Sequence, residues 1–243
     1  MTRNRPIPPM DPDDAAFARS LVLYEDTSVI VFNKPSGLAV QGGGGISQSL
    51  DSLLTAFAKS NGKRPRLVHR IDQGTSGLVI VACTQPAAAR LSDDFATRRA
   101  KKAYLALVGG RLPDADSGRI DAALVKVEEG GRPRMLAAAP GRKGAQAAVT
   151  DWTLLARNGD VALIRAEPET GRMHQIRAHF ANAGFPILGD RLYGTGASSA
   201  KRLMLHAARL TIRHPEGGEK TFEAPVPEDF RTEAERRGLQ SGL

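Results

Sequence analysis

The sequence predicts an α+β fold built on a central sheet that is mixed or mostly antiparallel. Strand-like segments outnumber helix-like segments and follow one another in hairpins, which disfavours Rossmann and TIM architectures. No internal repeat of fixed period occurs in the chain. With 243 residues, 41% of them hydrophobic, the chain can bury a core that suits one large domain or two closely packed lobes.

The N-terminal part of the chain begins with residues 1–17, which are rich in proline and show no period, so we expect a mobile arm there. A helix predicted by leucine spacing has Ser47 or Ser49 as its candidate cap. The elements expected in this part are strands on both sides of a turn at 25–27, a helix over 49–59, a buried strand over 78–83, and a helix from Thr84 to about residue 98.

The C-terminal part is predicted to be rich in strands. Its clearest signal is the Asn158-Gly159 pair between two β-branched segments, because such a pair favours the type I′ turn of an antiparallel hairpin. Residues 129–144 hold four glycines and two prolines, which predicts a loop. The elements expected here are strands over 101–110, 118–127, 147–156, 161–167, 203–212 and 220–224, a helix over 173–184, and a charged tail over 231–243.

The chain carries a net charge of +8, and its 34 basic residues divide into 25 arginines and 9 lysines. Because the guanidinium fork matches phosphates and base edges, this excess suggests a polyanionic partner, most simply nucleic acid; a GC-rich genome would raise the arginine content too. One cysteine excludes a disulfide-stapled scaffold and a Cys-ligated zinc site. No apolar run of about 20 residues and no signal-peptide pattern occur, so we expect a soluble, cytoplasmic protein.

The densest polar cluster is the segment 69–77, His-Arg-Ile-Asp-Gln-Gly-Thr-Ser-Gly, which lies between apolar segments. Asp72 beside Arg70 is expected to stay ionised and could act as a nucleophile or an electrostatic anchor. Gly74 and Gly77 would let a bulky ligand approach the backbone. Taken alone, the segment is equally compatible with an ordinary turn in which Asp72 and Thr75 bond local amides.

A second polar cluster, residues 169–179, lies at the predicted start of a helix, where free amides and the helix dipole favour an anion. His174 and Arg177 share one side of this helix. His174 and His179 are five residues apart, which is not the spacing of a zinc-binding helix, so we exclude a metal. A solvated basic face is the alternative interpretation.

Other chemistries lack their signatures. The glycines at 42–45 are not followed by the Gly-Lys-Ser/Thr of a phosphate-binding loop. A zinc-dependent base deaminase and a Gly-x-Ser-x-Gly hydrolase are excluded in the same way. Cys83, within an apolar segment, is predicted to be a buried structural thiol.

Taken together and in order, these segments resemble the RluA family of RNA pseudouridine synthases. The resemblance runs from about residue 21 to 227, nearly everything outside the two tails. It rests on five segments: 33–37 (Asn-Lys-Pro-Ser-Gly), the loop 69–77, 102–104 (Lys-Ala-Tyr), 171–177 with Gly189-Asp190, and 205–207 (Leu-His-Ala).

The amino-acid sequences of segments 39–47 and 69–77 most resemble those of the RluC-like subgroup that modifies large-subunit ribosomal RNA. Members of that subgroup usually carry an S4-like RNA-binding domain, and only some 20 residues precede the first expected strand here, so we expect no S4 domain. Smaller members without that domain act on transfer RNA or on a hairpin of the large-subunit RNA. Three departures from the family pattern are Gln41, Ile71 and Met173.

The resemblance implies a pseudouridine synthase catalytic fold: a central sheet flanked by helices, with a cleft between two lobes. We accordingly expect one catalytic domain over 18–230 between the two tails. The implied reaction isomerises uridine in structured RNA, 23S ribosomal RNA being favoured over transfer RNA, and requires no cofactor or metal. The implied catalytic residues are Asp72, Tyr104 against the flipped base, and Arg177 as the ion-pair partner of Asp72, with Arg172 as the other candidate.

Three roles for Asp72 fit the resemblance: attack on C1′, attack on the uracil ring, or removal of a sugar proton. Arg70 could fill the space that the flipped nucleotide leaves in the RNA. The residues expected to contact substrate or RNA are Lys34, His69, Arg70, Thr75, Ser76, Gly77, Arg172, His174 and Gln175. We expect a monomer whose partner is structured RNA. The alternatives are a non-catalytic RNA-binding or ribosome-assembly factor on the same fold, and a hydrolase using Asp72 with His69.

Overall fold

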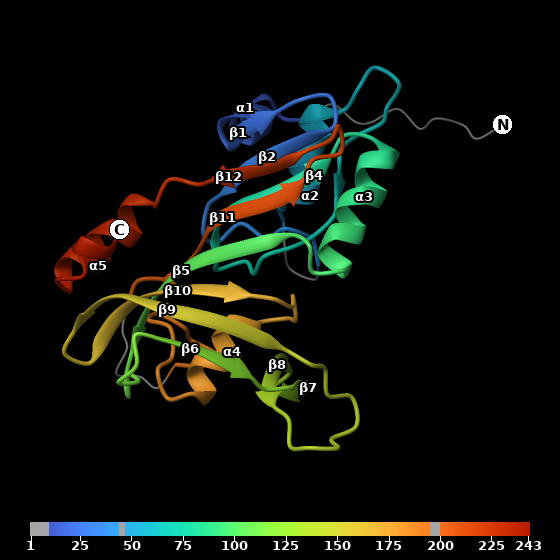
Figure 1. The fold of residues 1–243 in the computed structure, drawn as a ribbon. Coiled ribbons are helices and arrows are strands. Elements are labelled where there is room, and N and C mark those ends of the chain that lie inside the picture. The colour runs from blue at the N-terminus through green and yellow to red at the C-terminus, as the bar shows by residue number, and fades with distance from the viewer. Residues whose placement is uncertain (1–9, 44–46, 195–199) are drawn as a thin grey trace. The chain divides into compact units, whose positions relative to one another are not determined.

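The computed structural model describes residues 10–43, 47–194 and 200–243. The chain divides into two compact units, which we describe separately (Figure 1). Unit 1 comprises Met1–Ala100 and Thr211–Ala224, and unit 2 comprises Lys101–Leu210 and Pro225–Leu243. The chain therefore passes from one unit to the other at three points, after Ala100, Leu210 and Ala224.

Unit 1 is built around two adjacent apolar strands, β2 and β4. All the strand pairings given for its N-terminal segment are antiparallel: β1 with β2, β2 with β4, and β3 with β4. Five of the six β2 residues and all seven β4 residues are buried, which explains their near-continuous hydrophobic sequences. The elements are α1 (Pro12–Ser20), β1 (Val22–Glu25), β2 (Val29–Lys34), α2 (Leu50–Leu53), β3 (Arg66–Leu67), β4 (Ser76–Ala82), α3 (Gln85–Ala96) and β12 (Glu219–Glu223).

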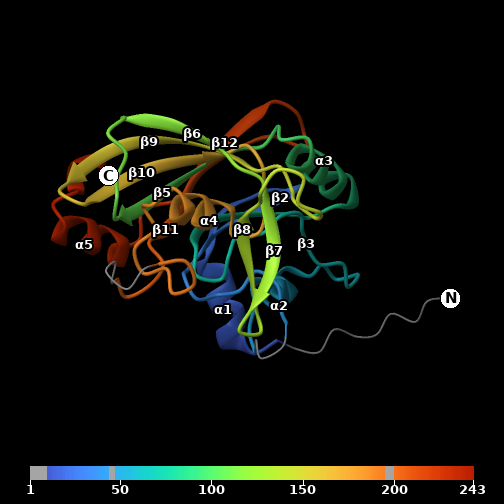
Figure 2. The same ribbon diagram turned by 90° about the horizontal axis from the view of Figure 1, so that it is seen from below.

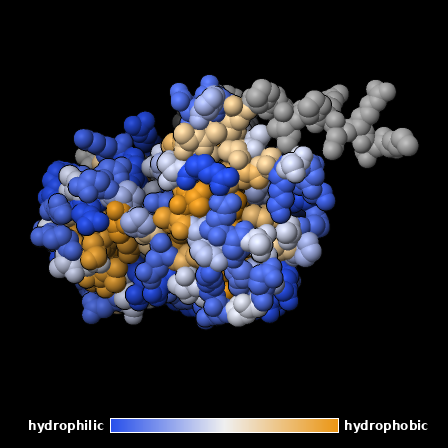
Figure 3. All heavy atoms as spheres, turned by 90° about the horizontal axis from the view of Figure 1, so that it is seen from above, coloured by the Kyte–Doolittle hydropathy of each residue, from blue (hydrophilic) through white to orange (hydrophobic). Residues whose placement is uncertain are grey.

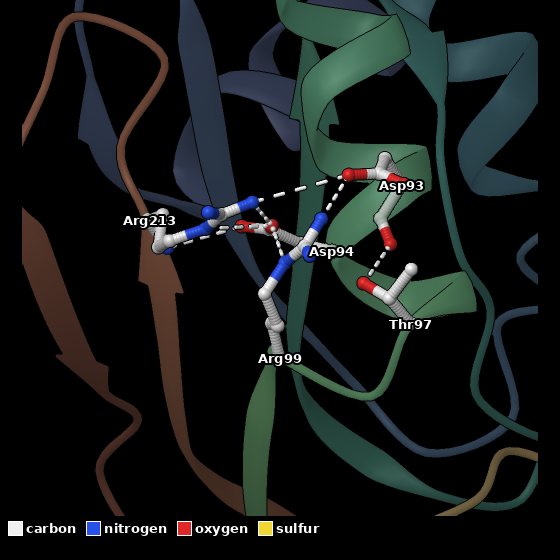
Figure 4. Close-up of polar contacts among 5 residues, drawn as sticks. All are labelled: Asp93, Asp94, Thr97, Arg99 and Arg213. Carbon is white, nitrogen blue, oxygen red and sulfur yellow. Dashed lines mark hydrogen bonds and ion pairs between the residues drawn. The ribbon is translucent and has the colours of Figure 1, made fainter.

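The second segment of unit 1 is tied to the first by side chains around α3. Arg213 comes from β11 (Leu205–Arg213), the strand that crosses from unit 2 into unit 1. Its Nη2 lies 2.6 Å from Oδ1 of Asp94, a side chain on α3 that is only 1% exposed, and Arg99 donates to the same oxygen through Nε at 3.2 Å (Figure 4). One buried carboxylate thus joins the end of α3 to β11.

Two expectations for unit 1 need correction. Residues 12–17 belong to helix α1 and not to a mobile arm, because Asp11 accepts a hydrogen bond from the backbone of Asp13 and Pro12 fits the first helical position. Residues 1–9 of that expected arm lie outside the described residues. The helix expected over 49–59 is one α-turn, capped by Ser49 and not Ser47, followed by a 3-10 turn at Leu54–Phe57.

Unit 2 contains an antiparallel group in the order β5-β10-β9-β6 and a separate β7-β8 hairpin. Its core includes Trp152, Phe180, Phe185 and Phe230. Helix α4 packs on β8, β9 and β10. The elements are β5 (Lys101–Gly109), β6 (Ser117–Asp121), β7 (Leu124–Glu129), β8 (Arg132–Ala137), β9 (Val149–Asn158), β10 (Val161–Pro168), α4 (Gln175–Asn182) and α5 (Glu228–Arg236).

The hairpins of unit 2 differ in detail from the sequence prediction. The single strand expected over 118–127 is two strands, β6 and β7. The loop expected over 129–144 contains β8, which pairs with β7 around Gly130-Gly131 (Figure 2). Both glycines have positive φ, so the glycine-rich sequence that indicated a loop makes a tight turn here. In the β9-β10 hairpin the central residues are Gly159-Asp160 and not Asn158-Gly159.

The C-terminal segment is also folded where a charged tail was expected. Ala234 and Leu239 are completely buried, and Glu233 accepts hydrogen bonds from Arg236 and Arg237. Helix α5 was not predicted, because its sequence is mostly polar and only a few of its residues face the core.

Figure 3 shows that hydrophilic side chains cover most of the face drawn, in keeping with a mean hydropathy of −0.27. Among the described residues, no helix is long and apolar enough to cross a bilayer.

Candidate active site

The Asp72 loop of unit 1 lies between β3 and β4, against the loop that follows β2. The β2-β4 register sets Lys34 opposite Gly77, so both loops leave the sheet at the same edge. Gly37 N donates to Gln73 O at 2.8 Å, and Ser36 Oγ donates to Gly74 O at 2.7 Å. The first and second segments of the family resemblance therefore form one hydrogen-bonded structure.

Lys34 is the cation at the centre of this structure. Its side chain is fully buried, and Nζ donates to the carbonyls of Pro35 at 2.9 Å, Leu38 at 2.7 Å and Gln73 at 3.2 Å. Three backbone carbonyls from two loops thus accept hydrogen bonds from one ammonium group. Lys34 therefore joins the two loops, and its expected contact with RNA stays a prediction.

Three more residues expected at the RNA surface also serve the loop. Thr75 and Ser76 are each 1% exposed, and Thr75 N donates to Asp72 O at 3.0 Å, which closes the turn. The His69 ring stacks on Phe95 with centroids 4.3 Å apart, and its Nε2 accepts a hydrogen bond from Ile80 N at 3.0 Å. These contacts show that Thr75 and His69 support the loop; the expected contacts of Thr75, Ser76 and His69 with RNA stay predictions.

Asp72 and Arg70 remain accessible in the same loop. Asp72 is partly exposed and Arg70 is exposed, whereas the neighbouring Ile71 is buried. The Arg70 guanidinium lies 3.3 Å from Gln41 Oε1. Gly77, with φ of 107°, starts β4 in a conformation that a side chain would strain. The loop thus presents the carboxylate of Asp72 and the guanidinium of Arg70, while hydrogen bonds from Ser36 and Gly37 hold its backbone.

Tyr104 and Lys102 lie two residues apart on β5 of unit 2, so their side chains share one face of the strand. Tyr104 is partly buried against the core and pairs with Ala166 across the sheet. Lys102 Nζ donates to Thr170 O at 3.1 Å. Burial lowers the pKa of Lys102 to about 8, so part of the population of this amine is neutral near pH 8.

Arg177, on helix α4, is oriented by a two-bond ion pair with Asp190. Nε donates to Oδ2 at 2.7 Å and Nη2 donates to Oδ1 at 2.9 Å. The backbone amides of Leu192 and Tyr193 donate to Asp190 as well, at 3.0 and 3.1 Å. Burial would raise the pKa of Asp190, but the charge and hydrogen bonds of Arg177 outweigh it and hold the pKa below its usual range.

Tyr193 completes this group and was missed by the sequence reasoning. The guanidinium carbons of Arg177 and Arg134 each lie 5.1 Å from the centroid of its ring. Its hydroxyl accepts from Met135 N at 2.8 Å and lies 3.1 Å from His174 Nδ1. The only signal available was its position three residues after Asp190 in the Gly189-Asp190 segment.

The segment before α4 does not present all its polar residues to solvent. Gln175 is 4% exposed: its Nε2 donates to Val149 O at 2.8 Å, and its Oε1 accepts from Thr170 Oγ1 at 2.6 Å. Gln175 therefore holds β9 to the start of α4, and its expected contact with RNA stays a prediction. His174 precedes the helix in a left-handed conformation with φ of 51°, so it does not share a helical side with Arg177 as expected.

Arg172 and His179 have separate roles. Arg172 is partly exposed and its Nε donates to Ala147 O at 3.1 Å. His179 is buried, with Nδ1 2.9 Å from Thr150 Oγ1 and Nε2 3.0 Å from Ala122 O. Burial lowers the pKa of His179, so the ring is neutral and structural. Within the described residues, no group of three or more His, Cys, Asp or Glu side chains could hold a metal ion.

The expected catalytic residues come from different parts of the chain: Asp72 from unit 1, and Tyr104 and Arg177 from unit 2. Within each unit, the residue is surrounded by other residues of the family resemblance. Lys34 and Ser36 support the loop of Asp72, Lys102 shares the strand of Tyr104, and Asp190 holds Arg177.

Comparison with known proteins shows the family to which the chain belongs. Residues 28–182 match the sequence profile of the RNA pseudouridylate synthase family. The dual-specificity RNA pseudouridine synthase RluA of Escherichia coli K12 is 37% identical over 210 residues, covering 85% of this chain and 93% of that protein. The ribosomal large subunit pseudouridine synthase C of Haemophilus ducreyi is 37% identical over 219 residues, 87% of this chain and 67% of that protein.

A solved structure shows the same fold. The human RNA pseudouridylate synthase domain containing 4 superposes with a TM-score of 0.78 at 25% identity, covering 93% of this chain and 97% of that one. The fold and its motif residues define an RNA-modifying isomerase. The chain belongs to the RNA pseudouridylate synthase family, and it is similar to RluA over most of its length. The predicted fold class and enzyme class are confirmed, and the non-catalytic alternative is disfavoured.

Proposed function

We propose that this chain converts uridines of structured RNA to pseudouridine, and that large-subunit ribosomal RNA and transfer RNA are both substrates. The observation that carries this proposal is the similarity to RluA relatives of Escherichia coli and Yersinia pestis, whose names state dual specificity, over 85–88% of the chain. A relative named as a large-subunit enzyme supports the ribosomal target. The proposed location, the cytoplasm, follows from these RNA substrates.

In the proposed reaction the bond between C1′ and N1 of uridine breaks, the uracil turns, and a bond forms between C1′ and C5. The proton on C5 leaves and N1 gains a proton, so the atoms of substrate and product balance and no co-reactant is consumed. Asp72 is the proposed catalytic carboxylate. Its partly exposed position on a supported loop suits a group that must meet a flipped nucleotide.

Tyr104 and Arg177 are the proposed partners of Asp72. Tyr104 would lie against the flipped base and assist proton transfer from C5. Arg177 would position the reacting carboxylate, and its own orientation is fixed by the bonds of Nε and Nη2 to Asp190. Arg70 would enter the RNA helix in place of the flipped nucleotide.

The decisive experiment is the substitution Asp72→Asn, assayed by tritium release from RNA labelled at C5 of uridine. We expect release to fall by about 10⁴-fold or more, as for loss of an essential catalytic group, with little change in RNA affinity. Asp14→Asn, another partly exposed aspartate of unit 1, is the matched control and should retain activity. Substantial release by Asp72→Asn would overturn the assignment of Asp72.

The RNA targets are tested by mapping pseudouridine in total RNA from cells with and without the gene. We expect sites to disappear from both large-subunit ribosomal RNA and transfer RNA, and to return when the wild-type gene is restored. Restoration of Asp72→Asn should not return them. Loss of sites from one RNA class alone would contradict dual specificity and keep the synthase assignment.

A further inference from the structure

Unit 1 contains a second concave site that the proposed chemistry does not use. It is a groove of about 880 Å³ between the turn at 59–63, strand β3 and the start of α3. That volume lies within the range of about 300–1,000 Å³ typical of ligand-binding clefts. The groove is lined by four basic side chains, Lys59, Lys63, Arg64 and Arg66, and by one acidic side chain, Asp51.

The basic residues of the groove fall into two kinds. Arg64 is held against Asp51, with Nη2 3.3 Å from Oδ2, and Arg66 donates to Gln85 Oε1. Lys59 and Lys63 are exposed, and no carboxylate within the described parts of the chain lies within salt-bridge distance of either. A backbone hydrogen bond of 2.9 Å from Lys59 N to Lys63 O keeps these two residues adjacent. The groove thus carries an excess of positive charge on a folded turn.

The chemistry of the lining selects the kind of ligand. None of the residues lining the groove is aromatic, so it offers no platform on which a base could stack. The first residues of α3, Gln85 and Pro86, line the groove with the positive end of the helix dipole. Cations, a helix start and no aromatic rings suit a phosphodiester backbone better than a base.

The groove is connected to the Asp72 loop within unit 1. Gln41 lines the groove, and its Oε1 lies 3.3 Å from Arg70 Nη1, two residues before Asp72. An RNA strand bound near Arg70 can therefore continue directly into the groove. We propose that this groove binds the phosphate backbone of the substrate RNA flanking the target uridine; the proposal rests on the proposed RNA modification.

The first test removes the two unpaired charges in the double variant Lys59→Gln/Lys63→Gln. We expect RNA affinity to fall about tenfold at physiological salt, and the slope of log K against log salt to decrease by about 1.4 for two single-strand contacts. The rate of pseudouridine formation at saturating RNA should be unchanged. The matched control, Arg98→Gln/Lys220→Gln, removes two charges from unit 1 outside the groove and should change neither quantity. Equal effects of the two double variants would overturn the proposal.

The second test uses Cys83, the single cysteine of the chain, which also lines the groove. Burial raises the pKa of its thiol to about 11, so a neutral disulfide reagent at pH 8.5 will react slowly enough to follow. A twelve-nucleotide oligouridylate should slow the reaction at least fivefold, and an oligomer of the same sequence with an uncharged methylphosphonate backbone should not. Absence of protection, or equal protection by both oligomers, would overturn the phosphate-binding groove.

These outcomes separate the groove from the catalytic assignment. If Asp72→Asn remains active while the oligouridylate protects Cys83, the assignment of Asp72 fails and the groove stands. If Asp72→Asn is inactive and the oligouridylate gives no protection, the groove fails and the catalytic assignment stands.

Discussion

The two units hold their candidate catalytic residues in different ways. In unit 1, buried Lys34 donates to three backbone carbonyls and joins two loops, one of which carries Asp72. In unit 2, buried Asp190 binds Arg177 directly through two side-chain hydrogen bonds. Asp72 is thus positioned through backbone conformation and Arg177 through its ion pair with Asp190. Mutations of Lys34 and of Asp190 should therefore change stability and activity to different extents.

The largest effect on stability is expected for Lys34→Met. The substitution keeps the apolar stem but leaves the carbonyls of Pro35, Leu38 and Gln73 buried without their shared donor. At about 1–3 kcal/mol for each unsatisfied group, three groups give about 3–9 kcal/mol. Because the bonds to Pro35 and Gln73 are only partly buried, we expect a loss of about 3–6 kcal/mol in the free energy of unfolding, measured with urea. Lys59→Met, an exposed lysine of the same unit, should change it by less than about 0.5 kcal/mol. Similar values for the two variants would show that Lys34 does not join the loops.

A smaller loss of stability, but a specific loss of activity, is expected for Asp190→Asn. The variant leaves the guanidinium of Arg177, which is 12% exposed, without its charged partner, so we expect a loss of about 3 kcal/mol, at the low end for a broken buried pair. Because Arg177 also loses its orientation, kcat should fall while KM changes little. Asp190→Glu should restore part of kcat. A fall in stability with unchanged kcat would mean that this ion pair is only structural.

The smallest effect concerns acid pH and compares Asp190 with Asp94 of unit 1. Burial would raise the pKa of both carboxyls, but their arginine partners outweigh it and lower both. A lowered folded-state pKa stabilises the fold fully above about pH 5 and loses its contribution as pH falls through the folded value. The difference between wild type and each Asn variant should therefore shrink from pH 7 to pH 3.

The losses of stability caused by Asp190→Asn and by Asp94→Asn should not be equal. Asp94 binds Arg99 and Arg213, whose side chains are 41% and 57% exposed, so solvent screens these pairs more than the pair of Asp190. We expect the larger difference at pH 7 for Asp190→Asn, by roughly 1 kcal/mol. A difference that stays constant between pH 7 and pH 3 would contradict the ionic origin of the effect.

Local sequence patterns predicted much of the fold because the decisive signals were short-range. The apolar run of β4, the Thr84 cap of α3 and the β9-β10 hairpin were all visible as patterns within a few residues. The β8 strand was missed because its glycines and prolines indicate a loop unless the facing strand is known. The α5 helix was missed because its sequence is mostly charged.

The candidate site was predicted as a set of residues with roles, and the structure does not test those roles against an RNA. The ordered motifs singled out Asp72, Tyr104 and Arg177, and these assignments remain proposals. They also placed Lys34 and Gln175 at the RNA surface, where the structure shows both buried among hydrogen-bond partners. The identity of a polar residue in a motif does not show whether its side chain faces the ligand or bonds to the neighbouring backbone.

The sequence by itself determined the family, the α+β class and the excess of arginine, since each of these is carried by residue identity and order. The tertiary structure alone decided which polar residues support the site and which remain accessible, because burial depends on neighbours that are distant in the chain. Lys34 with Gln73 and Arg177 with Asp190 are such pairs. The groove at Lys59 and Lys63 likewise exists only because four separate segments fold around one space.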